Sequence, residues 1–186
     1  MLIEKTISLE SKRCILRFIS ESDIPYIYSA TRFKGFNDGM AWNPPEDIEE
    51  LKEPYKNNVL AWENGTAFTF SIDNKSTNEF IGRITIRKQD ELGLWDIGYW
   101  THPKQQRKGY MSEVVPIIID FGFTELEANE ITAKYVDWNK ASEKVLKNAG
   151  MKFWKCIKEG MLKNGNWLEE NLMGIKRSEW QAMLRL

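Results

Sequence analysis

The chain of 186 residues is predicted to form one domain, residues 1–186, built on a mixed α/β sheet with helices on its faces. Short alternating segments typical of strands are interleaved with segments that have helical periodicity and helix caps. No repeat, low-complexity tract or flexible linker divides the chain. Hydrophobic residues make up 42% and aromatic residues 12%, which excludes disorder as a description of the whole chain.

The first elements are a strand and a helix. Residues 11–19 alternate apolar and polar side chains, which predicts a strand. Ser20 followed by Asp23 matches a capping box, so a helix is expected from there to about residue 31. Glycine, asparagine and aspartate then predict a loop over residues 32–40.

A second helix is expected next. Asn43 is predicted to cap it, Pro44 and Pro45 to form its first turn, and Glu46 to complete the capping box. Pro54 is expected to end or kink this helix at the residue before it.

Strands and helices alternate through the rest of the chain. We expect strands at 67–72, 80–87 and 94–101 that form a meander, then a polar loop at 102–108 and a helix from Gly109 to about 125. A strand at 131–136 follows, and then a helix capped by Asn139 and ended by Gly150, with Ala141, Val145, Leu146 and Ala149 on one face. The last strands are expected at 153–158 and 167–175, around an Asn164–Gly165 turn.

Charge, cysteines and chain ends narrow the class of protein. The net charge of −1 argues against a protein that coats nucleic acid. The N-terminal segment does not resemble a signal peptide, and the longest aliphatic run, residues 114–119, is far shorter than the roughly 20 residues that span a bilayer. We therefore expect a cytoplasmic protein with two buried thiols, Cys14 and Cys156, rather than a disulfide. A single histidine, His102, argues against a histidine-based metal site.

The segment from residue 97 to residue 112 carries the clearest chemical signal. It contains Lys104, Arg107 and Lys108 and no acidic residue. A strand ends here and a helix begins, and the first amides of a helix bind anions, above all phosphates. Gly109 would let a ligand approach the backbone closely. A solvated turn with an ordinary helix cap explains the same pattern, so both interpretations stay open.

The pattern Gln106-x-x-Gly109-x-Met111 resembles the acyl-CoA loop of the GNAT superfamily of N-acetyltransferases. The surrounding motifs are similar to its ribosomal-protein (Rim-type) branch, best over residues 80–174; they are Asp96-Ile-Gly-Tyr-Trp100, Gly109-Tyr-Met-Ser-Glu113, Asn139-Lys-Ala-Ser142, Val145-Leu146, Ala149-Gly150-Met151, Glu159-Gly160 and Trp180. Met111 in place of Gly or Ala departs from the superfamily pattern, and Pro116 inside the helix should bend it. The resemblance implies a mostly antiparallel, splayed sheet.

The resemblance also implies transfer of an acetyl group from acetyl-CoA directly to a primary amine, without a metal. The residues expected to bind the cofactor are Tyr99, Trp100 and Thr101 of the strand, Gln106, Arg107, Lys108, Gly109, Tyr110 and Met111 of the loop, and Asn139. Two of these have structural alternatives: Asn139 as a helix N-cap, and Tyr110 as a staple of the helix start.

Ser142 and Asp96 are the expected catalytic residues. By resemblance, Ser142 donates a proton to the leaving thiolate; the alternative is a solvated serine in a first helical turn. Asp96 is the candidate base, acting on the amine through water, and the alternative is an exposed strand residue. His102 is expected to be a loop residue rather than a base.

The acceptor channel in this superfamily is built from the first helices, their loop and the last strands. In this chain these segments contain Phe33, Phe36, Asp38, Met40, Trp42, Trp154, Trp167, Glu169 and Glu170. The acids and aromatic rings could hold a cationic amine; alternatively, the aromatic rings belong to the core and the acids are solvated. The acceptor could be a protein N-terminal amine, a polyamine or an aminoglycoside-like amine. An inactive CoA-binding sensor and an RNA-associated protein remain alternatives. We expect an amine as partner, neither nucleic acid nor membrane, and leave a homodimer open.

Overall fold

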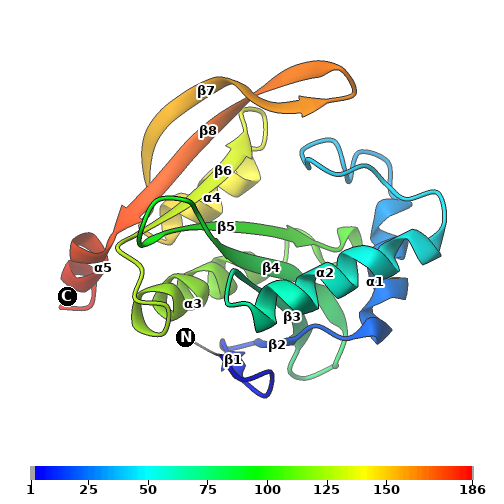
Figure 1. Cartoon of the computed structure of the whole chain (residues 1–186), viewed down its shortest axis with the longest axis horizontal. Helices are drawn as coiled ribbons and strands as arrows, with labels where there is room; N and C mark the ends of the chain where they lie inside the picture. Colours follow the sequence, from blue (N-terminus) through cyan, green and yellow to red (C-terminus); the bar gives the residue numbers. More distant parts are fainter. Residues whose placement is uncertain (1–2, 186) are drawn as a thin grey trace.

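The computed structural model describes residues 3–185, in which eight strands form one sheet in the order β1-β2-β3-β4-β5-β6-β8-β7 (Figure 1). The strands are β1 Ser8–Glu10, β2 Cys14–Phe18, β3 Ala67–Asn74, β4 Phe80–Lys88, β5 Leu94–Thr101, β6 Glu130–Val136, β7 Lys152–Lys163 and β8 Asn166–Lys176. All neighbours are antiparallel except β5 and β6, which are parallel. The predicted fold class, with its meander of three central strands, is confirmed.

Helices lie on both faces of the sheet. They are η1 Glu21–Asp23, α1 Ile24–Thr31, η2 Ile48–Leu51, α2 Lys52–Glu63, η3 Pro103–Gln105, α3 Tyr110–Thr124, α4 Lys140–Asn148 and α5 Arg177–Met183. One face packs against α3 and α4 in the main core, and the other packs against α1 and η2 in a smaller cluster. α3 continues through Pro116 to Thr124. No helix within residues 3–185 is long and apolar enough to cross a membrane.

The main core forms because alternate residues of the central strands face α3. Phe68 and Phe70 of β3 meet the Phe121 ring of α3 edge-on, at centroid distances of 5.9 and 5.5 Å. Both rings also pack against Trp62 of α2, which is 2% exposed. Each such aromatic pair adds about 1 kcal/mol beyond burial of its area.

The start of the second helix was predicted wrongly. Asp47, not Asn43, is the cap, and its side chain accepts from the amide of Glu49 and forms a capping box with Glu50. Pro54 lies in the first turn of α2 and neither ends nor kinks it. A proline is tolerated there because the first amides of a helix have no partner within the helix.

Other differences concern the edges of the fold. The sequence did not indicate β1 or α5, and β7 and β8 extend beyond the predicted 153–158 and 167–175. Ala141 is exposed, so the apolar face of α4 begins only at its second turn. Cys14 and Cys156 are both free thiols as expected, but Cys156 is exposed because it lies on the edge strand β7.

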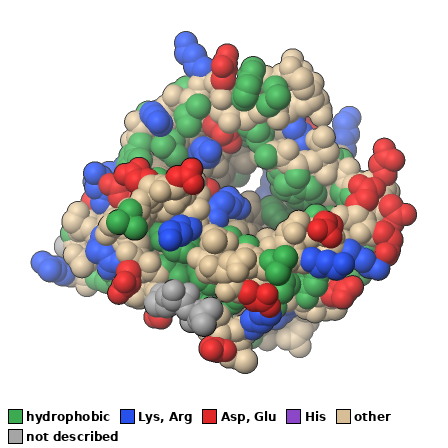
Figure 2. Space-filling model, viewed as in Figure 1, with side chains coloured by type: hydrophobic (Ala, Val, Ile, Leu, Met, Phe, Trp, Pro, Cys, Tyr) green, Lys and Arg blue, Asp and Glu red, His purple; other side chains and the backbone are tan. Residues whose placement is uncertain are grey.

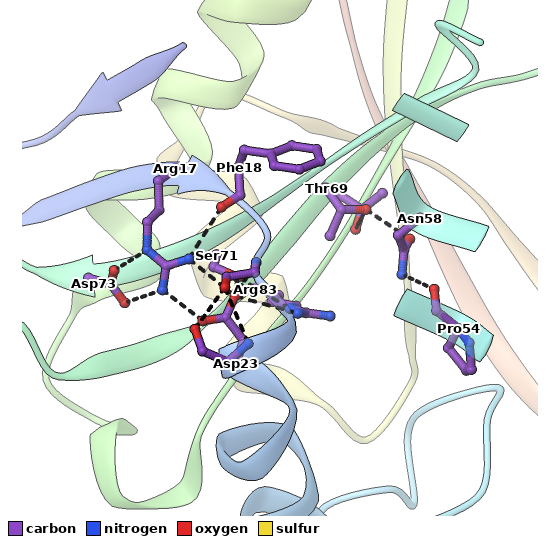
Figure 3. A network of polar contacts seen from close by, with 12 residues as sticks. Arg17, Phe18, Asp23, Pro54, Asn58, Thr69, Ser71, Asp73 and Arg83 are labelled. Atoms are coloured by element: carbon purple, nitrogen blue, oxygen red, sulfur yellow. Dashed lines mark hydrogen bonds and ion pairs between the residues drawn. The ribbon is translucent and has the colours of Figure 1, made fainter. Parts of the chain in front are cut away.

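A buried network of charges fixes the start of α1 to the sheet (Figure 3). The Asp23 carboxylate, 1% exposed, accepts from Arg17 at 2.7 Å and from the Ser71 hydroxyl at 2.6 Å. Arg17 is also bound by Asp73, and Arg83 lies 3.6 Å from Asp23. Burial by itself would raise the pKa of Asp23, but the hydrogen bonds from Arg17 and Ser71 outweigh it and lower the pKa.

We expect Asp23→Asn to lower the free energy of unfolding by about 3 kcal/mol at pH 7, because it removes one partner of a buried ion pair. A lowered folded-state pKa stabilises the protein above the unfolded-state pKa, and this contribution is lost as pH falls through the folded-state value. The difference from wild type should therefore narrow below about pH 4 in urea denaturation.

Glu63→Gln is the matched control, because the Lys5–Glu63 ion pair is exposed and should contribute less than about 1 kcal/mol. Equal effects of the two substitutions would show that the Asp23 network does not hold α1 to the sheet.

Candidate functional site

The parallel strands β5 and β6 pair over four residues and then diverge. Their pairing runs from Leu94 opposite Glu130 to Ile97 opposite Ala133. Beyond that point β6 continues to pair with β8, whereas residues 98–101 of β5 pair only with β4. The edge of β5 that faces β6 therefore offers partly buried backbone amides and carbonyls of residues 98–101 to a ligand.

A hollow lies where the two strands separate. Figure 2 shows it between the β7–β8 hairpin and the segment that precedes α2. The segment of residues 32–42, which we call the acceptor loop, closes its far side. The Lys163 ammonium at the tip of the hairpin donates to the carbonyls of Met40 and Trp42 at 2.9 and 2.8 Å. Gly39 packs so closely against Val136 that a Cβ there would lie 3.1 Å from it.

The basic loop leads into α3, whose start carries no side-chain cap, at the position where the sequence predicts an anion site. Gly109 precedes the helix with φ of +81°, in the left-handed region that favours glycine, and it offers no side chain to cap the first amides. These amides carry the positive end of the helix dipole. Arg107 is exposed, whereas Lys108 donates to Gln105 at 2.7 Å. The Gln106 side chain donates to the Thr101 carbonyl at 3.3 Å, which joins the loop to β5.

Arg13, which sequence reasoning missed, lies just before β2 and braces this loop. Its Nε donates to Glu113 at 2.5 Å and its Nη2 donates to the Lys108 carbonyl at 2.9 Å. Its guanidinium also lies over the Tyr110 ring, 4.7 Å from the centroid. Only the pairing of distant segments reveals this contact, because about 100 residues separate the partners.

Tyr110 and Met111 have buried side chains in the main core. The Tyr110 hydroxyl accepts from Asn74 at 3.0 Å, so this side chain staples the helix start, as the structural alternative predicted. Their backbone amides remain at the start of α3, where an anion would bind.

Ser142 lies against Tyr99 on the α3–α4 side of the sheet. The two hydroxyl oxygens are 2.8 Å apart, and the Tyr99 hydroxyl is also 3.4 Å from the Ser142 carbonyl. Burial raises the pKa of Tyr99 to about 12, so the phenol stays protonated. Either hydroxyl can be the donor in this pair, and the Ser142 proton is available to another acceptor when the phenol is the donor.

Asn139 caps α4, since its side-chain oxygen accepts from the Ser142 amide at 3.1 Å. The structural reading of Asn139 is therefore confirmed. The Asn139 amide nitrogen makes no hydrogen bond within residues 3–185, which leaves a donor for a ligand.

Asp96 lies on the opposite face of β5 from Ser142. It is 7% exposed, so the exposed-residue alternative is wrong. Its two oxygens accept from Arg87 and Thr132, each at 3.1 Å. Burial is the main influence on the pKa of Asp96 and raises it, against the opposing effects of Arg87 and Thr132.

Trp100 points to the same side as Asp96, into an aromatic wall with the acceptor loop. Its ring meets that of Phe36 edge-on at 5.4 Å, and Phe36 meets Trp42 at 6.2 Å. His102 is buried, and its Nδ1 accepts from the Lys104 amide, so it caps η3 as a loop residue. Burial lowers the pKa of His102.

Not every residue expected at the acceptor side lies there. Trp167 is 53% exposed on the hairpin, and Phe33 packs on His102. Glu169 points to the face opposite the hollow, beside Cys156, whose pKa it raises. Glu170, one residue on, therefore points to the side of the hollow.

Comparison with known proteins agrees with this geometry. A family model described as an acetyltransferase (GNAT) domain matches residues 13–152. The uncharacterized N-acetyltransferase YnaD of Bacillus subtilis is 28% identical over 92% of this chain and 98% of its own. The uncharacterized N-acetyltransferase p20 of Bacillus licheniformis is 39% identical over 67% of this chain and 68% of its own.

Two solved structures share the fold. RimL, a ribosomal L7/L12 alpha-N-protein acetyltransferase in complex with coenzyme A, superposes with a TM-score of 0.82 and 20% identity over 91% of this chain and 98% of its own. Spermidine N-acetyltransferase from Vibrio cholerae, in complex with CoA and spermine, has a TM-score of 0.78 and 18% identity over 90% and 98%. The matched domain, the diverging strands and the loop before α3 together place the chain in the GNAT family of acetyltransferases.

Proposed function

We propose that this protein transfers an acetyl group from acetyl-CoA to the α-amine of a protein N-terminus, as a Rim-type member of its family. One observation carries the acetyl-CoA part: the unpaired edge of β5 and the uncapped start of α3 meet at the same end of the sheet. The amides at the α3 start suit a pyrophosphate, and the edge at residues 98–101 suits an extended, amide-containing arm.

The residues around the gap divide the chemistry between two faces of β5. When bound, acetyl-CoA supplies the acetyl group as an activated thioester. On one face, Tyr99 holds the Ser142 hydroxyl so that its proton can reach the sulfur that leaves. On the other face, the negative charge of Asp96 attracts the ammonium group of the acceptor. Asn139 donates to the arm of the cofactor through its free amide nitrogen.

The residues of the hollow constrain the identity of the acceptor amine less than the β5 edge and the α3 start constrain that of the cofactor. The hollow carries both signs of charge, Asp96 with Arg87 and Glu170 near Lys134. Such a surface suits one ammonium group followed by a neutral peptide better than it suits a polycation. The similarity to a spermidine N-acetyltransferase makes a polyamine the second candidate.

We expect acetyl-CoA with a peptide that has a free N-terminus to release CoA thiol, and the same peptide with a blocked N-terminus to release none. Spermidine and an aminoglycoside, tested in parallel by the same thiol assay, should be poor acceptors. Faster release with spermidine would favour the polyamine enzyme. Binding of acetyl-CoA without release of CoA thiol in the presence of any amine would identify a sensor. Absence of a thermal shift with acetyl-CoA would exclude both the acetyltransferase and the sensor.

Gly109→Trp should abolish binding of acetyl-CoA in calorimetry, because the new side chain blocks the approach of the pyrophosphate to the backbone. Gly165→Trp is the matched control: its φ of +79° resembles that of Gly109, and a Cβ there would meet no atom within 4 Å. Both variants bear the same backbone strain of about 1–2 kcal/mol, but only the first should lose the ligand. Unchanged binding by Gly109→Trp would overturn the assignment of the loop.

Ser142→Ala should lower kcat by about 100-fold and leave the KM for acetyl-CoA nearly unchanged, since loss of a general acid affects the chemical step. Ser178→Ala, which also removes a first-turn helix serine but in α5, should have no effect. Tyr99→Phe should lower kcat in the wild-type background and not in the Ser142→Ala background, because Tyr99 acts through Ser142. An unchanged kcat in Ser142→Ala would remove this residue from the mechanism.

A further inference from the structure

The hollow has a carboxylate that neither the fold nor the charge networks require. Strand alternation places Asp96, Thr132, Lys134 and Glu170 on one face of the sheet, the face of the acceptor loop. Asp96 already has both oxygens occupied by Arg87 and Thr132. Its charge is already balanced by Arg87 and each oxygen already accepts one hydrogen bond, so it is less suited than a free carboxylate to receive an ammonium group.

Glu170 differs from Asp96 in each of these respects. It is partly buried, and no hydrogen bond or ion pair to its carboxylate is formed within residues 3–185. It lies opposite Val136, which packs against Gly39 of the acceptor loop. The bulge of β7 leaves Gly160 beside it, where a Cβ would lie 2.7 Å from the Glu170 Cβ. A glycine at position 160 thus makes room for this carboxylate.

We propose, on the basis of the acetyltransferase function proposed above, that Glu170 binds the ammonium group of the acceptor and takes its proton. Glu170 receives one proton from the ammonium and later releases it to solvent. The freed nitrogen lone pair forms the bond to the acetyl carbon as the carbon–sulfur bond breaks. The sulfur takes the Ser142 hydroxyl proton, and the second proton of the nitrogen restores the hydroxyl.

The charges around Glu170 tune it for this role. Burial is the main cause that raises its pKa; the Lys134 ammonium on β6 lowers it, and the Asp96 carboxylate on β5 raises it. On β7 the adjacent Gly160 has no side chain. A raised pKa makes Glu170 a stronger base than an ordinary glutamate, closer to the value of an α-amine. Asp96 then contributes through its charge rather than by contact.

Glu170→Gln tests this role, and Glu169→Gln is the matched control, because the neighbouring carboxylate points to the opposite face. We expect Glu170→Gln to raise the KM for the peptide amine by at least about tenfold at pH 7, as expected for loss of a charged hydrogen bond, and to leave the KM for acetyl-CoA unchanged. Calorimetry of the peptide binding to the CoA complex should show the same loss of affinity. Equal behaviour of the two variants would overturn the inference.

The pH profile of kcat/KM separates a proton acceptor from a structural residue. Lys134→Gln should shift the acidic limb to higher pH, since Lys134 lowers the pKa of Glu170, and Asp96→Asn should shift it to lower pH. Neither shift should occur in the Glu170→Gln background, and shifts that persist there would assign the limb to another group.

Experiments on the wild-type protein distinguish failure of the proposed acetyltransferase function from failure of the Glu170 assignment. If the wild type binds acetyl-CoA but acetylates no amine, the acetyltransferase proposal fails. Calorimetry with the peptide then decides whether Glu170 still binds an amine, because it compares Glu170→Gln with Glu169→Gln without any turnover.

Discussion

The functional geometry depends on the point at which β5 and β6 stop pairing. Four parallel pairs hold the strands together, and β6 then follows β8 away from β5. Backbone groups on the freed edge of β5 need partners that the sheet no longer supplies. In the function proposed above, this gap in the middle of the sheet is where a cofactor on one face meets an acceptor on the other.

Two braces hold the sides of this gap. Beside the start of α3, Arg13, the residue before β2, binds the Lys108 carbonyl and Glu113 of α3, which holds the first turn of this helix in place. The Asp23 network fixes the start of α1, and the acceptor loop follows the other end of this helix. Lys163 then ties that loop to the β7–β8 hairpin. Both sides are therefore positioned by charged contacts between segments far apart in the chain.

The two faces of β5 also separate the two proton transfers. Tyr99 and Ser142 lie on one face, and Asp96 and Glu170 lie toward the other. The carboxylates lie apart from the hydroxyl pair of Tyr99 and Ser142 and do not exchange protons with it directly. The acid and the base can therefore keep different pKa values. In the proposed reaction the acetyl group passes through the gap between β5 and β6. Glu170 takes the first proton of the amine on one face, and the second proton passes to Ser142 on the other.

The sequence by itself determined the order of the elements from β2 to β8, the caps at Ser20 and Asn139, and the basic segment before α3, because these depend on periodicity and on contacts within a few residues. It misplaced the cap of the second helix, because Asn43 and Asp47 both suit that role locally and a proline is accepted in a first turn as readily as it ends a helix. Only the tertiary structure decided which side chains meet across the gap. The engagement of Asp96, the brace of Arg13 and the free carboxylate of Glu170 depend on strand register, and a shift of one residue would turn each side chain to the other face.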